Sequence, residues 1–216
     1  MFITLEGGEG AGKTTQILHL AEWFQRRGTS CILTREPGGT PLGKSIRALL
    51  LNPENQGMAA ETELMLYMAD RAEHVHKVIL PALTAGRTVL CDRFFDATLV
   101  YQGAARGLPL ERLVQLHRLV LGGLRPQLTL LLDLPPEVGL SRARGQLAKG
   151  ARALTESRFE HEAIEFHRRV REGYLNLARQ EPDRFRILDA ALDEERVQAE
   201  IRTAVDNFIH RPGASA

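Results

Sequence analysis

The sequence predicts an α/β protein in which one parallel sheet carries helices on both faces. Short apolar runs alternate along the chain with longer segments whose apolar residues recur at helical spacing. The short runs are almost continuously apolar, which is typical of strands covered on both sides. Strands that alternate with helices favour a parallel sheet, because each crossover helix returns the chain to the same edge.

Five apolar runs are predicted to be the strands. They span residues 2–5, 31–33, 88–90, 128–132 and 185–188. Apolar stripes at helical spacing predict helices that include residues 17–24, 64–79, 113–120, 159–177 and 197–208. Residues 143–157 break this pattern, because they are rich in Gly, Ala, Arg and Lys and lack apolar periodicity, so we expect a mobile loop there.

The composition is that of one globular domain. Of the 216 residues, 44% are hydrophobic and 25% are charged, which supports a core of ordinary size. We expect a single domain over residues 1–209 and a disordered tail over 210–216, where Pro, Gly and Ser gather. No apolar run approaches the roughly 20 residues of a membrane-spanning helix, so no membrane partner is expected.

Charge and cysteine usage narrow the possible function classes. The formal net charge is only +1, whereas nucleic-acid-binding domains usually carry a clear basic excess, so nucleic acid is not an expected partner. Cys31 and Cys91 lie in apolar runs without the spacing of a metal site, and are expected to be buried free thiols. These thiols, and a strand-like run at the start in place of a signal peptide, predict a cytoplasmic location.

A glycine-rich loop follows the first predicted strand and precedes an amphipathic helix. Its sequence, which matches G-x-x-x-x-G-K-[ST], is Gly7-Gly8-Glu9-Gly10-Ala11-Gly12-Lys13-Thr14. Such a loop turns backbone N–H groups towards phosphate oxygens, and the helix N-terminus adds positive potential. We expect residues 7–15, up to Thr15, to bind ATP, with Lys13 at the β- and γ-phosphates and Thr14 on Mg²⁺. The alternative is a glycine-rich turn with an incidental lysine.

Three charged residues lie where metal, sugar and phosphate contacts are needed. Glu9 would be repelled by the phosphates, so we expect it to face a sugar hydroxyl of a second substrate; the alternative is a solvent-facing carboxylate. Asp92 follows an apolar run and is placed to hold Mg²⁺ directly or through water. Arg93 offers a bidentate contact to phosphate. The alternative for Asp92 and Arg93 is a salt bridge at a strand end.

Several motifs, in this order, resemble those of the thymidylate kinase family of the bacterial type. They are Thr34-Arg35-Glu36-Pro37-Gly38-Gly39-Thr40, Asp92-Arg93-Phe94, Tyr101-Gln102-Gly103, Arg106-Gly107, Leu124-Arg125-Pro126 and Arg158-Phe159-Glu160. The resemblance covers residues 2–190. The first of these motifs is much more specific than the glycine-rich loop, which many families share.

The resemblance implies a P-loop nucleoside monophosphate kinase fold with a five-stranded sheet in the order 2-3-1-4-5. It also implies a homodimer that transfers the γ-phosphoryl group of ATP to dTMP with Mg²⁺, a step of dTTP biosynthesis. Because the acceptor phosphate is already a nucleophile, this reaction needs positioning and charge neutralisation rather than a general base. Two alternatives stay open: a related kinase with another acceptor, and a nucleotide-binding module that has lost turnover.

Arginines are expected to offset the repulsion between the two phosphate groups. Arg93 is the first candidate to bridge donor and acceptor. The family match adds Arg35 and Arg47 on the acceptor side, and Glu36 as a residue that organises the metal or its waters. Each arginine taken alone is also compatible with an ordinary surface position.

Two pairs of residues at helical spacing predict a pocket for the base. Tyr67 and Arg71 share one helix face, so an aromatic ring can stack on a pyrimidine while a guanidinium donates to its O4. Thr98 and Gln102 have the same spacing and are expected to read the N3–O4 edge. The resemblance places Tyr101 under the sugar, where it disfavours a 2′-hydroxyl. Half-buried core packing is the alternative for Tyr67.

The resemblance implies a lid, at about residues 141–158, that supplies a catalytic arginine because the glycine-rich loop has none. Arg144 and Arg152 are the first candidates, followed by Arg158 and Arg142, and a solvated lid surface is the alternative for each. The chain departs from the family pattern in this lid, where residues 148–157 are additional and Ser157 replaces an Asp. It also has Tyr67 where Phe is usual and Ala97 where Ser is common.

Overall fold

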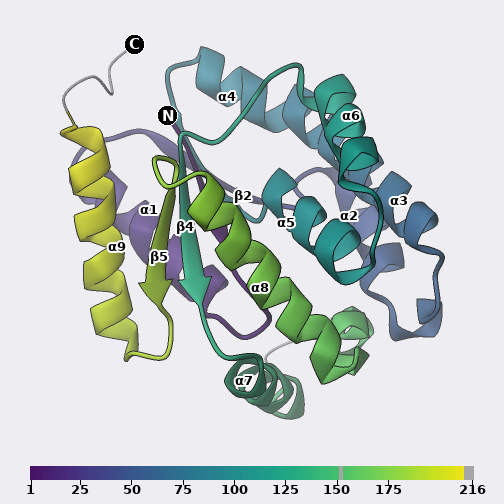
Figure 1. The fold of residues 1–216 in the computed structure, drawn as a ribbon. Helices are drawn as coiled ribbons and strands as arrows, with labels where there is room; N and C mark the ends of the chain where they lie inside the picture. The colour runs from purple at the N-terminus through teal and green to yellow at the C-terminus, as the bar shows by residue number, and fades with distance from the viewer. Residues whose placement is uncertain (151–152, 212–216) are drawn as a thin grey trace.

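Five strands form one parallel sheet. In the computed structural model, which describes residues 1–150 and 153–211, their order is β2-β3-β1-β4-β5 (Figure 1). The strands are β1 (Phe2–Glu6), β2 (Cys31–Arg35), β3 (Thr88–Asp92), β4 (Leu128–Asp133) and β5 (Phe185–Asp189). The predicted order and the parallel pairing are confirmed, and each strand runs one or two residues beyond its predicted carboxyl end.

The centre of this sheet is the most deeply buried part of the fold. All residues of β1 are buried, and Thr4 Oγ1 lies 2.9 Å from Thr129 Oγ1 of β4, so the two hydroxyls satisfy each other inside the core. Complete burial does not extend to β2 and β5, because each pairs on one side only. Cys31 of β2 is therefore only half-buried, whereas Cys91 of β3 is buried as expected.

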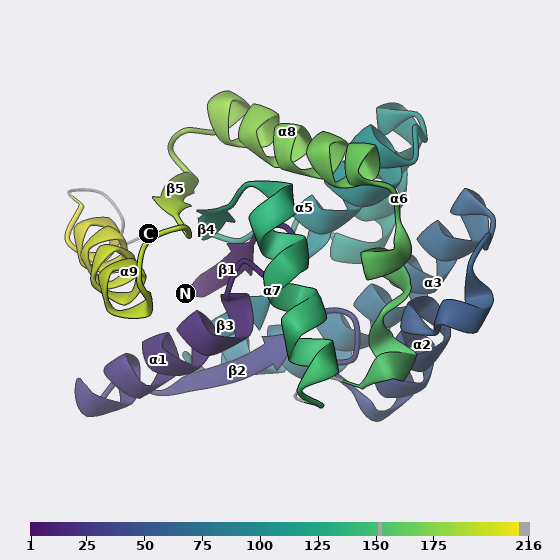
Figure 2. The ribbon, with the colours of Figure 1, turned by 90° about the horizontal axis from the view of Figure 1, so that it is seen from below.

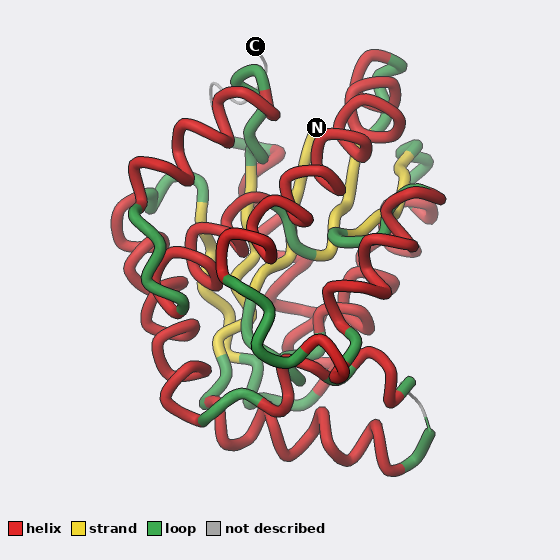
Figure 3. Tube along the Cα trace, turned by 90° about the vertical axis from the view of Figure 1, so that its right-hand side faces the viewer, coloured by secondary structure: helices red, strands yellow, loops and turns green. Residues whose placement is uncertain are grey.

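Helices cover both faces of the sheet, and Figure 3 shows the strands running between them. The helices are α1 (Lys13–Arg26), α2 (Pro41–Leu51), α3 (Ala60–His74), α4 (Leu80–Thr84), α5 (Phe95–Thr98), α6 (Leu110–Leu121), α7 (Pro136–Ala148), α8 (Ile164–Gln180) and α9 (Glu194–Ile209). On one face, Leu20 of α1 and Ile201 of α9 pack against the strands. On the other face, Val170 of α8 packs with Leu131 of β4.

Polar residues end the strands at one edge of the sheet. Arg35 at the end of β2 lies beside Asp92 at the end of β3, and Asp133 lies beside Asp189. Helix α7 lies across this edge (Figures 1 and 2). Because open parallel sheets bind ligands outside the carboxyl ends of their strands, this edge is where a site is expected.

The segment between α7 and α8 differs from the sequence prediction. Helix α7 continues to Ala148, so residues 143–148 are helical rather than part of a loop. The helix predicted over 159–177 begins at Ile164, and Arg158–His161 form a separate 3₁₀ turn. Phe159 still packs beside Phe166, with ring centroids 6.2 Å apart. It therefore shares the apolar face of α8 without belonging to that helix, which explains the misleading periodicity.

Two π-helical segments adjust the helices near the site. The first, Val75–Ile79, follows α3 and precedes α4, whose Pro81 has no N–H to donate. The second segment, Leu99–Ala105, follows α5 and buries the adjacent residues Tyr101 and Gln102 together.

Two further expectations concern the membrane and the tail. Within residues 1–150 and 153–211, no helix combines the length and the apolar character that crossing a membrane requires. Of the predicted tail, residues 212–216 lie outside the described residues.

Candidate active site

The glycine-rich loop joins β1 to α1. Gly7, Gly10 and Gly12 have φ angles of 141°, 67° and 87°, which residues with a Cβ rarely adopt. Lys13 opens α1 and donates to the carbonyl oxygens of Gly7 at 3.1 Å and Gly8 at 2.7 Å. Burial is the main cause that lowers the pKa of Lys13 to about 8. The loop thus brings a helix N-terminus and a lysine to one point, as phosphate binding requires.

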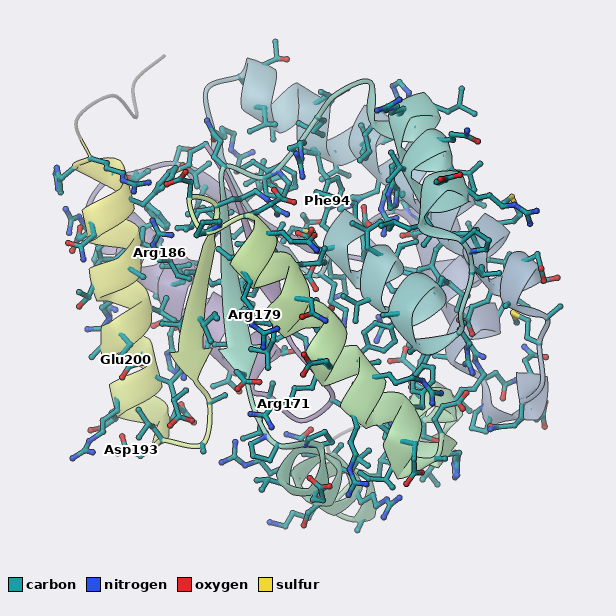
Figure 4. All side chains as sticks on the ribbon, viewed as in Figure 1. Phe94, Arg171, Arg179, Arg186, Asp193 and Glu200 are labelled. Carbon is teal, nitrogen blue, oxygen red and sulfur yellow. The ribbon has the colours of Figure 1, made fainter. Side chains whose placement is uncertain are left out.

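The loop packs closely against α7. A Cβ on Gly10 would collide with the carbonyl oxygen of Gly139, and a Cβ on Gly139 would collide with that of Glu9. Helix α8 is tied to the same edge by Arg171, which donates to the two oxygens of Asp133 at 2.7 and 2.8 Å (Figure 4). The loop and the two helices are therefore held in one arrangement.

A broad cleft opens beside the loop. It encloses about 1340 Å³, part of it open to solvent, and is lined by residues 9–15 together with Arg35 and Asp92. Thr14 Oγ1 donates to Asp92 Oδ2 at 3.0 Å, so the two predicted Mg²⁺ ligands lie together. Among the described residues, no three His, Cys, Asp or Glu side chains are grouped to hold a metal alone. One hydroxyl and one carboxylate suit a hard cation that also uses phosphate oxygens and water.

Arg93 follows β3 and adopts an unusual backbone conformation. Its φ is 66°, and no other non-glycine residue in the described ranges has a positive φ. The guanidinium donates to Glu9 Oε1 at 2.9 Å and to Tyr174 Oη at 3.2 Å, and lies 4.9 Å from the centroid of the Tyr101 ring. Tyr101 Oη also donates to Glu9 Oε1 at 3.0 Å. Glu9 is therefore held by an arginine and a tyrosine rather than facing solvent freely.

A narrower pocket adjoins the cleft. It encloses about 560 Å³, and its lining includes Glu9 and the five other residues predicted to hold the base and sugar. Those five are Tyr67, Arg71, Thr98, Tyr101 and Gln102. Tyr67 and Arg71 come from α3, and the other three come from the end of α5 and the π-helical segment after it. Helical spacing thus predicted four of these residues and the family resemblance predicted Tyr101, and all five converge on one cavity from two directions.

Arg71 is held inside the wall of this pocket. Its side chain is 1% exposed and donates to Glu36 Oε2 at 2.7 Å, Thr98 Oγ1 at 2.9 Å and the Phe94 carbonyl oxygen at 3.1 Å. His117 Nε2 lies 3.1 Å from Arg71 Nη1. Because a guanidinium only donates, His117 accepts there and is neutral. Burial, together with the charge of Arg71, lowers the pKa of His117 to about 3.

Glu36 is buried, and both of its oxygens have protein partners. Oε2 accepts from Arg71, and Oε1 lies 2.8 Å from His74 Nδ1. His74 Nε2 lies 2.6 Å from Thr34 Oγ1 of β2. These contacts make Glu36 a partner of Arg71, whereas the sequence suggests a role at the metal. His74 carries no signal in the sequence, because its partners are distant along the chain.

Two further arginines line the cleft. Arg35 is exposed at the end of β2. Arg47 of α2 donates to the Pro37 carbonyl oxygen at 3.1 Å and pairs at 2.8 Å with Glu156, which follows α7. Arg47 lines the narrower pocket as well as the cleft. Of the two predicted acceptor-side arginines, Arg47 therefore lies where the two cavities meet, whereas Arg35 lines the cleft alone.

The cleft and the pocket share part of their walls. Glu9, Glu36, Arg47 and Arg93 line both cavities. Ligands bound in the two cavities would therefore meet beside two guanidinium groups. Such an arrangement suits two anionic groups that must approach each other.

The structure does not bring Arg144, the first of the lid candidates, to the loop. Arg144 is exposed on α7 and borders a separate groove, whereas Gln146 is the α7 residue that lines the cleft with Lys13. Arg152 lies outside the described residues.

The two lower-ranked lid arginines are engaged elsewhere. Arg158 is 1% exposed, donates to the carbonyl oxygen of Leu50 and pairs with Glu63 at 2.6 Å. Arg142 donates to the carbonyl oxygen of Ala190 at 2.9 Å. Both contacts hold the ends of the lid to the body of the protein, so neither guanidinium lines the cleft.

Several residues near the site carry only a weak sequence signal. Glu6 is a charged residue that ends an apolar run, and Tyr174 is predicted only as one member of an apolar stripe. Asp70 accepts from the backbone N–H of Gly38 at 3.0 Å, and burial, followed by the charge of Glu36, raises its pKa to about 6. Their roles depend on contacts between distant segments, which spacing along the chain does not reveal.

Comparison with known proteins gives one consistent family. The family model described as thymidylate kinase matches residues 5–201. A thymidylate kinase of Desulfosudis oleivorans is 53% identical over 214 residues, which cover 98% of this chain and 100% of that protein. One of Desulforapulum autotrophicum is 55% identical over 206 residues, which cover 95% and 91%.

A solved structure shares the fold as well. The crystal structure of thymidylate kinase from Ehrlichia chaffeensis matches with a TM-score of 0.75 and 33% identity, covering 95% of this chain and 98% of that one. The matched family model includes the glycine-rich loop, the strand ends and the pocket described above. The chain belongs to the thymidylate kinase family.

Proposed function

We propose that this enzyme transfers the γ-phosphoryl group of ATP to dTMP, giving ADP and dTDP in dTTP biosynthesis. The observation that carries this proposal is that Glu9, Glu36, Arg47 and Arg93 line both the cleft and the narrower pocket. A triphosphate in the cleft would meet a monophosphate in the pocket end to end, as in-line transfer requires. Membership of the thymidylate kinase family supplies the identity of both substrates.

The donor side uses the glycine-rich loop. Residues 7–15 would hold the phosphates of ATP, with the N-terminus of α1 directed at them. Lys13 bonds to the carbonyl oxygens of Gly7 and Gly8, and would exchange these contacts for the β- and γ-phosphates. A phosphate group is the stronger acceptor because it is charged.

Thr14 and Asp92 fit a magnesium ion bound together with ATP. Their side-chain oxygens are 3.0 Å apart, and oxygen ligands of this kind are those that magnesium prefers. When bound, the ion would neutralise charge on the β- and γ-phosphates. The two residues would orient it, while the phosphates and water complete its ligands.

The acceptor side reads the base with groups that the protein already orients. Gln102 Nε2 donates to Glu63 Oε1 at 2.8 Å, which leaves the amide oxygen to accept from N3–H of thymine. Arg71 and Thr98 would face O4, with the Tyr67 ring against the base. Ala97 also lines this wall, so a methyl group stands where the family often has a hydroxyl.

The sugar and phosphate of dTMP would lie nearer the cleft. The Tyr101 hydroxyl and Glu9 bond to each other at 3.0 Å, which places a ring and a carboxylate where a ribose 2′-hydroxyl would need space. Arg35 and Arg47 would neutralise the acceptor phosphate, and Arg93 would bridge it to the γ-phosphoryl group. Arg144 and Arg152 remain the candidates for the lid arginine, and single Ala variants separate them.

We also propose a homodimer in the cytoplasm. Leu49 of α2, Met65 of α3 and Leu119 of α6 are 51%, 48% and 81% exposed. Helix α3 contacts both α2 and α6, so these side chains belong to one group of helices that a second copy would cover. Free Cys31 and Cys91 fit a reducing compartment. Light scattering after size-exclusion chromatography gives the oligomeric state, and a monomer would contradict the proposal.

The decisive experiment is a coupled assay of ADP formation from ATP. We expect ADP release that depends on dTMP and is far weaker with AMP, GMP or CMP, with a Lys13→Ala variant as the background. Stimulation by another monophosphate alone would indicate a related kinase instead. Binding of ATP and dTMP by calorimetry without product would indicate a module that has lost turnover.

A further inference from the structure

Glu6 is a buried carboxylate directly below the glycine-rich loop. It ends β1, its side chain is fully buried, and it lines neither the cleft nor the pocket. Both oxygens have partners: the backbone N–H of Phe94 donates to Oε1 at 2.7 Å, and Tyr174 Oη donates to Oε2 at 2.7 Å. A charge in the core is costly without such bonds, so a glutamate here calls for an explanation.

Both partners of Glu6 lead to Arg93. Phe94 follows Arg93 directly, so the first bond holds the peptide group next to the residue with the positive φ of 66°. Tyr174 Oη donates to Glu6 while accepting from Arg93 Nη1 at 3.2 Å, so the second chain of bonds ends on the guanidinium. One carboxylate is thereby connected to the backbone and to the side chain of the same arginine.

We propose that Glu6 is a positioning residue for Arg93, acting through the Phe94 amide and the Tyr174 hydroxyl. It does not touch either substrate. Its task is to hold the bridging guanidinium where the cleft and the pocket meet. This inference rests on the proposed function, because it assigns a cause to the geometry of the arginine that would join the two phosphates.

The charged form of Glu6 suits this task better than the protonated form. A carboxylate accepts at both oxygens, whereas a carboxylic acid must donate from one of them and would lose or reverse one of the two bonds. Burial, followed by the charge of Asp96, raises the pKa of Glu6 to about 7, while Arg93 and the two hydrogen bonds oppose the rise. The charge of Glu6 also acts on two neighbouring groups, Lys13 of α1 and the Cys91 thiol of β3, and raises the pKa of each.

The test compares the wild type with Glu6→Gln and Tyr174→Phe in the dTMP-dependent assay. Near pH 8, we expect kcat to fall about tenfold in each variant, since Glu6→Gln loses one of the two bonds that Glu6 accepts and Tyr174→Phe removes the hydroxyl that joins Glu6 to Arg93. The KM values for ATP and dTMP should change less than about threefold, since neither residue contacts substrate. In the double variant, the combined loss should be smaller than the product of the single losses, because the two residues act on one guanidinium.

The pH profile separates positioning from a general structural role. Wild-type kcat should decline as the pH falls below about 7, when Glu6 takes up a proton. Glutamine resembles the protonated acid at every pH, so the ratio of wild-type to Glu6→Gln kcat should shrink from about tenfold near pH 8 towards one near pH 5.5. A ratio that does not change with pH would overturn the proposal.

Asp96→Asn is the matched control in the same core. Asp96 pairs with Arg184 at 2.6 Å and forms no hydrogen bond or ion pair with Arg93, so this variant should unfold at lower urea concentration yet keep wild-type kcat near pH 8. In this variant kcat should begin to fall at a lower pH than in the wild type, because removing the charge of Asp96 lowers the pKa of Glu6. An equal loss of kcat in Asp96→Asn and Glu6→Gln would show that any weakening of this core is sufficient, and the assignment would fall.

Two outcomes keep this proposal distinct from the proposed function. If the wild type shows no dTMP-dependent turnover, the function itself fails. If the wild type is active and Glu6→Gln keeps its kcat, only the role of Glu6 fails. Should Glu6→Gln not fold, Tyr174→Phe carries the same expectation of a lower kcat at unchanged KM, and full activity of that variant would overturn the inference.

Discussion

Arg158 and Glu63 form an ion pair that is almost wholly withdrawn from solvent. Arg158 Nη2 lies 2.6 Å from Glu63 Oε2, and the two side chains are 1% and 0% exposed. Glu63 also accepts from Gln102 Nε2 at 2.8 Å and from Arg106 Nη2 at 3.2 Å. It thus connects the turn that follows the lid to the wall of the base pocket.

Removing the charge of Glu63 should therefore destabilise the protein strongly. Glu63→Gln leaves the buried guanidinium of Arg158 without its carboxylate and removes one of the two carboxylate partners of Arg106, so we expect the free energy of unfolding to fall by about 3–5 kcal/mol. Urea unfolding followed by circular dichroism measures the change. Glu137→Gln, which removes an exposed partner of Arg168, is the control and should leave the unfolding midpoint near that of the wild type. Equal shifts in the two variants would contradict the buried pairing.

Lys13→Ala should abolish most turnover while the fold survives. The variant removes the cation that would contact the β- and γ-phosphates, and loss of one such contact lowers kcat about 100-fold or more. The coupled assay gives kcat, and circular dichroism confirms the fold. Lys77→Ala removes an exposed lysine far from the loop in sequence, and should remain fully active. Near-normal turnover in Lys13→Ala would argue against the phosphate-binding loop.

Arg71→Ala should raise the KM for dTMP more than the KM for ATP. Arg71 lines the pocket but not the cleft, and a hydrogen bond from a charged group contributes enough for an increase of about tenfold or more. Initial rates with each substrate varied in turn measure the two constants. Arg196→Ala, at an exposed position of α9, is the control. Equal increases for both substrates would place Arg71 outside the base pocket.

His117 should make folding stability depend on pH. Its folded pKa is lowered from 6.5 to about 3, so the unfolded chain takes up a proton below pH 6.5 while the folded protein does not. The stability from this neutral histidine is complete above pH 6.5 and falls by about 1.4 kcal/mol per pH unit as the pH decreases from there towards 3.

His117→Gln tests this dependence, because the amide oxygen can still accept from Arg71 but does not titrate. Urea unfolding at several pH values between about 7 and 4.5 should give a shallower loss of stability in the variant than in the wild type. The same slope in both proteins would show that His117 is not the residue responsible.

Two glycines of α7 should respond oppositely to alanine. A Cβ on Gly139 would meet the carbonyl oxygen of Glu9, whereas a Cβ on Gly145 has nothing within 4 Å. We expect Gly139→Ala to lower the free energy of unfolding by about 1–3 kcal/mol through overpacking. Gly145→Ala should raise it by about 0.5–1 kcal/mol, because alanine favours a helix. Thermal unfolding ranks the stabilities of the variants. A destabilised Gly145→Ala or an unchanged Gly139→Ala would contradict the close packing of α7 against the glycine-rich loop.

Much of the fold could be predicted because its signals are local. The run before Gly7 and the lysine after Gly12 define a strand, a loop and a helix within a few residues. The spacing of Tyr67 and Arg71 likewise gives a helix face directly. The order of the strands is not a local property, and it was predicted only through the resemblance to a family.

The parts that escaped prediction depend on contacts between distant segments. Phe159 packs on α8 from a separate turn, so its periodicity is real although the helix begins later. Glu6, His74 and Glu63 are isolated charged or polar residues in the sequence, and their partners become known only when strands and helices meet. The position of Arg144 on α7 depends on where that helix ends, and composition alone suggested a loop there.

The burial of Arg71 has a consequence for how the pocket meets its ligand. Four protein groups surround the guanidinium before any nucleotide arrives, so its rotational freedom is given up when the chain folds and not when dTMP binds. In the proposed binding mode, a base with a mismatched edge would meet a guanidinium that is already fixed. If Arg71 contacts the base as proposed, selection among pyrimidines would be built into the ligand-free protein rather than acquired during encounter.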